Sequence, residues 1–313
     1  MLSRTADNLY WLGRLMERAE NLSRILEVGD RMSVIPRGDD EPHTEWHSTL
    51  VISGTHEQFY EQHEAPDQDL VIDYLALDPS NPSSIRSCLE TARRNARSVR
   101  TAMTTEMWES LNATWLDFIG ERIEQLRDGD LRGFVEWVRE RSTIFRGAAY
   151  GTMLRTDRFY FLRIGTFIER ADNTARILDV KYHVLMPEEE AVGGSLDYSQ
   201  WVALLRSVSA ARSFHWLYRE SLKPSLVAEL LILREEMPRS LTSCLSEVNS
   251  YLEKLAEVYG SRRECHRGAG ELYARLRYGR TEEVFQIGLH EYLTDFIERN
   301  NRLNDEITRA YLT

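Results

Sequence analysis

The sequence predicts an all-α protein that is built as an internally duplicated helical bundle. Apolar residues recur at helical intervals through most of the chain, as in Leu9, Leu12, Met16 and Ala19, whereas the alternating pattern of strands is nearly absent. Glycines and prolines fall between the periodic segments, so we expect about ten to twelve helices, most of them long. The second supporting observation is an internal repeat.

The repeat is clearest in one charged helix. GRLMERAENLSRILEV at 13–28 and GTFIERADNTARILDV at 165–180 are identical at nine of sixteen positions, and Glu20 is replaced by Asp172. The apolar positions form a stripe along one side of the predicted helix. Because the polar side has kept its residue types as well as the apolar side has, solvent exposure alone does not explain it.

A second pair of segments extends the repeat. PSSIRSCL at 82–89 and PRSLTSCL at 238–245 match at five of eight positions, in the same order along the chain and at a similar offset. These matches indicate a duplication with halves at 1–152 and 153–313. We expect the halves to pack about a pseudo-twofold axis in one compact body.

The composition excludes several classes of protein. Hydrophobic residues make up 42% of the chain and charged residues 28%, which is enough for a buried core. A formal net charge of -11 argues against a nucleic-acid-binding protein. The three cysteines form no Cys-x-x-Cys pair, and no apolar stretch is long enough for a signal peptide or a membrane span. We therefore expect a cytoplasmic protein that does not bind membranes.

The polar side of the repeated helix holds the first candidate site. The two copies carry the same types of charged and amide residues at equivalent positions, namely Glu17, Arg18, Asn21 and Arg24 in the first and Glu169, Arg170, Asn173 and Arg176 in the second. One interpretation is a semi-buried network of glutamates and arginines that joins the halves. The other is a polar cleft that holds a substrate or the charged group of a partner. The sequence leaves both open.

An arginine stripe occurs only in the first half. Arg93, Arg97 and Arg100 have the i, i+4, i+7 spacing of one helical face, and the aligned segment SEVNSYLEKLA contains no arginine. Guanidinium groups in this arrangement suit carboxylates or phosphates of a ligand. Alternatively, they pair with acidic residues of a neighbouring helix, such as Glu17 or Glu169.

Motifs for metal or cofactor binding are not found. No histidine follows a glutamate by three residues, as di-iron bundles require, and no glycine-rich phosphate loop occurs. The sequence therefore predicts neither a metal site nor a cofactor. His183, at the end of the second repeated helix, is a candidate for the polar cleft, with a structural role as the alternative.

These segments resemble the Alpha-E family of bacterial all-helical proteins, which is named after a Glu-Arg motif. The resemblance extends over essentially the whole chain and rests on LSRTADNLYWLGRLMERAEN (2–21), NPSSIRSCLETARRNARSVR (81–100), IERADNTARILDVKYH (168–183) and MPRSLTSCL (237–245). The family motif corresponds to Glu17-Arg18 and Glu169-Arg170. Arg94 stands where the family pattern has a glutamate.

The resemblance implies a biochemical setting for the chain. Members of the family occur beside a circularly permuted ATP-grasp ligase and a transglutaminase-like protein, which implies a system that makes or modifies peptides through ATP-driven amide bonds. We therefore expect a non-catalytic partner that binds the ligase and presents an acceptor substrate. The alternatives are a transferase-type enzyme with its cleft at Glu17, Glu169, Arg93 and Arg97, and a purely structural scaffold.

Overall fold

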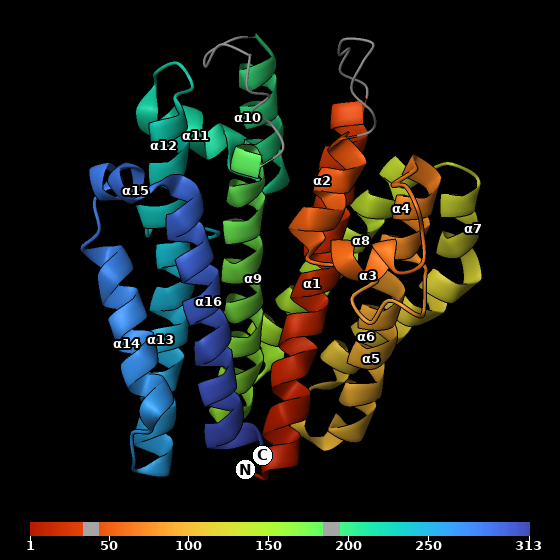
Figure 1. The fold of residues 1–313 in the computed structure, drawn as a ribbon. Coiled ribbons are helices and arrows are strands. Elements are labelled where there is room, and N and C mark those ends of the chain that lie inside the picture. Colours follow the sequence, from red (N-terminus) through yellow and green to blue (C-terminus); the bar gives the residue numbers. More distant parts are fainter. Residues whose placement is uncertain (34–43, 184–194) are drawn as a thin grey trace.

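Two long helices, α1 (Ser3–Ser33) and α9 (Asp157–His183), run side by side in the same direction through the middle of the molecule (Figure 1). Helices α4 to α7 lie beyond α1 on one side, and α13 to α16 lie beyond α9 on the other. The two termini meet at one end of the bundle. The helices that carry the repeated segment are therefore central neighbours.

The computed structural model describes residues 1–33, 44–183 and 195–313, and it gives only the helix backbone for 44, 180–183 and 195–197. All regular structure in these ranges is helical, which confirms the predicted fold class. Besides α1 and α9, the α-helices are α2 (Thr44–Ser53), α3 (His56–Tyr60), α4 (Gln68–Ala76), α5 (Ile85–Ser98), α6 (Thr105–Asp117), α7 (Ile123–Arg127), α8 (Leu131–Thr152), α10 (Ser195–Ser207), α11 (Ala211–Tyr218), α12 (Pro224–Ala228), α13 (Leu241–Tyr259), α14 (Glu264–Arg277), α15 (Thr281–Ile287) and α16 (Leu289–Ile307).

The described helices outnumber the ten to twelve that the sequence predicts. Short helices of five to seven residues, such as α3 and α12, account for the excess. A 3-10 turn follows α5 at Arg100–Ala102, and π-helical turns follow α6, α12 and α16 at Phe118–Arg122, Glu229–Leu233 and Thr308–Leu312. The apolar periodicity of the sequence continues across such breaks, so it does not predict where one helix ends and the next begins.

The second repeated segment begins a helix in each half. The Ser84 hydroxyl accepts a hydrogen bond from the Ser87 backbone N–H at the start of α5, and the Ser240 hydroxyl accepts one from the Ser243 N–H at the start of α13. These serines are N-caps, which satisfy backbone donors that a helix leaves unpaired. Helix α5 then packs against α1, and α13 packs against α9.

A glycine on each central helix allows the two backbones to approach. A Cβ atom on Gly13 would lie 2.1 Å from the Leu162 carbonyl oxygen, and one on Gly165 would lie 2.1 Å from the Tyr10 carbonyl oxygen. No side chain fits at either position. The close crossing brings the Glu-Arg pair of α1 opposite that of α9.

The length and apolar character of the described helices can be set against those of a membrane-spanning helix. Within residues 1–33, 44–183 and 195–313, none combines sufficient length with sufficient apolar character to cross a bilayer.

Candidate functional site

The two Glu-Arg pairs bind each other across the α1–α9 crossing. Arg170 donates from Nε to Glu17 Oε1 and from Nη2 to Glu17 Oε2, each at 2.8 Å. Arg18 donates from Nε to Glu169 Oε1 at 2.5 Å and from Nη2 to Glu169 Oε2 at 3.0 Å. Each arginine thus holds the other helix's glutamate through two parallel hydrogen bonds, the strongest geometry for this pair.

The region around Glu17 is sealed by further arginines. Arg239, just before α13, donates from Nη1 to Glu17 Oε1 at 3.1 Å and from Nη2 to Glu20 Oε1 at 2.6 Å. Arg146 of α8 pairs with both glutamates. The Glu17 and Glu20 side chains are 1% and 0% exposed. No ligand can reach these carboxylates without displacing an arginine.

Charges in the sealed region hold the carboxylate of Glu17 ionised. Burial by itself would raise the pKa of Glu17, but the charges of Arg170 and Arg239 outweigh burial and place this pKa well below its usual range. Burial lowers the pKa of Arg239 to about 10, although Glu17 opposes that change. The region is a buried network in which each carboxylate has more than one cationic partner.

Arg24, the last member of the first motif, belongs to the same network. It donates from Nη2 to Glu20 Oε1 at 2.8 Å and from Nη1 to the Ser207 carbonyl oxygen at 2.9 Å. Because Ser207 ends α10, this arginine also ties α1 to a helix of the second half of the chain.

The region around Glu169 is open. A pocket of about 230 Å³ lies beside this carboxylate, between α1, α9 and the end of α2. Its polar lining consists of Arg14, Arg18, Asn21, Ser53, Gly54, Ser83, Glu169, Asp172, Asn173, Arg176 and Asn301. Three arginines and two carboxylates give this lining a net positive charge. We name this hollow the α1–α9 pocket.

Glu169 forms the floor of the α1–α9 pocket. In addition to the bonds from Arg18, it accepts one from Arg14 Nε at 2.8 Å. Burial would raise its pKa, but the charges of Arg18 and Arg14 prevail and lower the pKa of Glu169 to about 2. The carboxylate is therefore ionised at neutral pH and fixes both arginines in place.

Several polar groups of the pocket lack partners within the described residues. Arg176 donates from Nε to Asp172 Oδ2 at 2.7 Å, while its two terminal nitrogens make no hydrogen bond there. Asp172 Oδ1 and Asn21 Nδ2 are buried and unpaired, and Asn173 lines the same pocket. Buried polar atoms are normally satisfied, so this set points to a ligand with both acceptors and a donor.

The arginine stripe lies outside both regions. Arg93 donates from Nε to Asn112 Oδ1 at 2.9 Å, Arg97 is exposed, and Arg100 lies over the Trp108 ring. The expected pairing of this stripe with Glu17 or Glu169 is wrong, and so is the expected cleft that combines them. Helix α5 turns its apolar face towards α1, which directs the arginines outwards.

Sequence reasoning missed the arginines that separate the two regions. Arg239 occupies the position in PRSLTSCL that Ser83 occupies in PSSIRSCL. Ser83 lines the open pocket and accepts a 3.4 Å hydrogen bond from Arg18. This position is one of the three at which the two segments differ, and it was the available signal. Arg14 aligns with Thr166, and Arg146 lies outside both aligned segments, so neither was singled out in the sequence.

The three cysteines do not supply an activated nucleophile to the site. Burial raises the pKa of Cys88 and of Cys244 to about 12, and burial raises that of Cys265 to about 11, so all three are protonated thiols. His183 ends α9, and its side chain lies outside the described residues.

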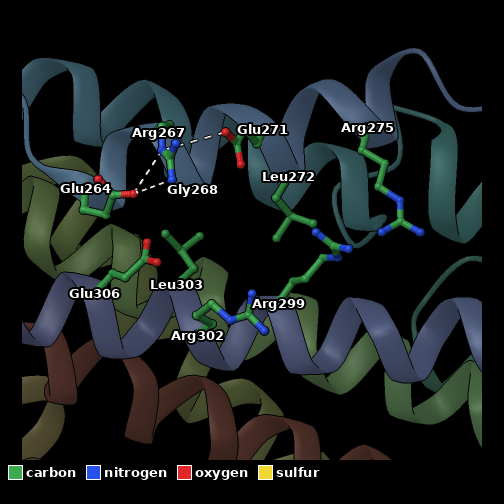
Figure 2. A pocket seen from close by; sticks show the side chains of 10 residues that line it. All are labelled: Glu264, Arg267, Gly268, Glu271, Leu272, Arg275, Arg299, Arg302, Leu303 and Glu306. Atoms are coloured by element: carbon green, nitrogen blue, oxygen red, sulfur yellow. Dashed lines mark hydrogen bonds and ion pairs between the residues drawn. The ribbon is translucent and has the colours of Figure 1, made fainter.

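A second pocket, also of about 230 Å³, lies between α14 and α16 (Figure 2). Leu272 and Leu303 point into it from opposite helices. Several of its charges are paired locally, because Arg267 pairs with Glu264 at 2.7 Å and with Glu271 at 3.8 Å. Arg275 and Arg299 both pair with Asp295. With these arginines neutralised, this pocket is the weaker candidate for a charged ligand.

The chain was compared with known proteins. No curated protein and no solved structure matches it. A family model matches residues 1–312, and its description is a predicted alpha-helical domain with a conserved ER motif, called Alpha-E. The Glu-Arg pairs at 17–18 and 169–170 have the residue types of such a motif. The chain belongs to the Alpha-E family.

Proposed function

We propose that this chain is a non-catalytic partner of a circularly permuted ATP-grasp ligase in the cytoplasm, and that it holds a carboxylate-bearing acceptor substrate. The observation that carries the proposal is the α1–α9 pocket, where an ionised Glu169 holds Arg14 and Arg18 in place and Arg176 lines the same hollow. The partner ligase is what the family resemblance implies. A transglutaminase-like protein belongs to the same proposed system.

The chemistry of the pocket supports an acceptor such as a peptide end. Among the described residues, the two terminal nitrogens of Arg176 have no hydrogen-bond partner, and they match the two oxygens of a carboxylate. The unpaired Asp172 Oδ1 can accept a hydrogen bond from an amino or hydroxyl group of the same molecule. A volume of about 230 Å³ accommodates a group the size of one or two residues rather than a nucleotide.

We further infer that the molecule is a duplication whose halves are related by a pseudo-twofold axis. The contacts of α1 and α9 are reciprocal, since Gly13 faces Leu162 and Gly165 faces Tyr10. The Glu-Arg pairs exchange in the same way. This inference accounts for two related regions in one chain, one of which is closed by Arg239 and Arg146.

The test is reconstitution of the ligase reaction with and without this chain. We expect ATP-dependent amide formation by the ligase to increase on addition of the chain, and the Arg176→Gln variant to lose that increase because the acceptor carboxylate loses its donors. The matched control is Arg132→Gln, which removes an 81% exposed arginine far from the pocket lining. ATP turnover by the chain alone would instead favour the transferase alternative.

An equal increase with wild type and Arg176→Gln would reject the pocket as the acceptor site. If the chain also formed no complex with the ligase in size-exclusion chromatography, the partnership itself would be rejected. A stable complex with no dependence on Arg176 would favour the scaffold alternative.

A further inference from the structure

We propose that the outer face of helix α5 is a docking surface for an acidic helix of a partner protein. This arginine face consists of Arg86, Arg93, Arg97 and Arg100. It is separate from the α1–α9 pocket, whose lining contains none of these residues. The inference therefore does not depend on what the pocket binds.

The charges of the arginine face are not neutralised within the described residues. None of its four arginines forms an ion pair there, whereas each of the arginines of α1 at positions 14, 18, 24 and 31 does. The nearest carboxylates in sequence, Glu90 on α5 and Glu106 and Glu109 on α6, pair with none of them. In a chain with 50 acidic and 39 basic residues, such a face is not a by-product of excess arginine.

Two of these arginines are already held in position. Arg93 is fixed through Nε by Asn112, and the Arg100 guanidinium lies 5.2 Å from the centre of the Trp108 ring. Both partners are on α6, and both contacts leave terminal nitrogens free. A preorganised guanidinium loses less conformational entropy on binding than a free one, which favours a carboxylate partner.

The spacing of the arginines identifies the shape of the partner. Arg93, Arg97 and Arg100 follow one face of a helix of 14 residues, about 21 Å long, and its 3-10 extension. A second helix packed alongside would meet them with carboxylates at the same i, i+4, i+7 positions. A net charge of -11 repels a long phosphate backbone more strongly than a short helix with a few carboxylates, so an acidic protein helix fits better than nucleic acid.

The arginine face is not required by the fold. Helix α13 packs on α9 as α5 packs on α1, yet the segment at 246–256 that aligns with 90–100 contains no arginine. Asn249 and Glu253 stand at the positions of Arg93 and Arg97. A helix in this place is therefore stable without an arginine face, and the face calls for another explanation.

The probe is an alanine-based helical peptide of about 20 residues with glutamates at i, i+4, i+7 positions, labelled for fluorescence anisotropy. We expect it to bind the full chain, more weakly at about 150 mM than at about 20 mM salt. The triple variant Arg93→Gln, Arg97→Gln, Arg100→Gln should weaken binding about tenfold. The control variant Arg127→Gln, Arg132→Gln changes exposed arginines that pair with nearby glutamates, and should bind like wild type.

Circular dichroism and thermal melting establish that the triple variant folds. Equal affinities of a folded triple variant and wild type would overturn the proposal, as would equal losses in the triple and control variants. A single-stranded DNA of similar charge that bound wild type more tightly than the peptide would replace the proposed partner with nucleic acid. A glutamine version of the peptide that bound equally well would also overturn it.

Discussion

The two Glu-Arg regions of this molecule share a motif but differ in access. At Glu17, arginines from α8 and from the turn before α13 close over the carboxylate, which is 1% exposed. At Glu169, serine stands where Arg239 stands in the other copy, and a pocket remains. The same motif therefore forms a closed ion-pair network in one place and the floor of a pocket in the other.

Removing the charge of each glutamate tests the difference in access between the two regions. Glu17→Gln leaves Arg170 and Arg239 buried without their carboxylate, so we expect a loss of roughly 3 to 5 kcal/mol in the free energy of unfolding. Glu169→Gln should cost less, because Arg18 reaches the pocket and can be solvated. Urea denaturation measures both.

Glu124→Gln is the control for the glutamate variants, since this carboxylate is 68% exposed and pairs only with Arg127. It should change the free energy of unfolding by about 1 kcal/mol or less. Equal losses for the two buried glutamates would contradict the difference in access.

Both regions depend on the close backbone contact between α1 and α9, which a second set of variants tests. Gly13→Ala and Gly165→Ala each place a methyl group against a backbone carbonyl of the other helix, so each should cost about 1 to 3 kcal/mol of unfolding free energy. The two losses should be similar, because the contacts are reciprocal. Gly147→Ala on α8 is the matched control: its Cβ would meet nothing within 4 Å, so alanine should be neutral or stabilising there. A tolerated Gly13→Ala would show that the helices are not in backbone contact.

The sequence predicted the fold class, and it singled out polar residues that lie at the central crossing without deciding between a network and a cleft. Helical periodicity was sufficient for the first, because the described residues contain only helices. The repeat was sufficient for the second, because residues retained on the polar side, such as Glu17 and Arg170, proved to contact each other. Both inferences depend on local patterns, which can be recognised in a single sequence.

The difference between the two regions could not be predicted in the same way. It depends on Arg146 and Arg239, which are distant in the chain and reach the crossing only through the register of α8 and α13. The orientation of the arginine face, in contrast, was available from the helical wheel. Cys88, Leu89 and Ala92 form the buried face of α5, and the arginines lie opposite.

The most direct test is arginine modification by phenylglyoxal in the native protein, read by mass spectrometry. The side chain of Arg176 in the α1–α9 pocket is 30% exposed, whereas those of Arg170 and Arg239 in the sealed region are 10% and 8% exposed. The side chain of Arg132 is 81% exposed, so its rate of modification is the reference for an accessible arginine. We predict that Arg176 is modified in the folded protein and that Arg170 and Arg239 are modified only after unfolding. Modification of Arg239 as fast as Arg176 under native conditions would contradict the account.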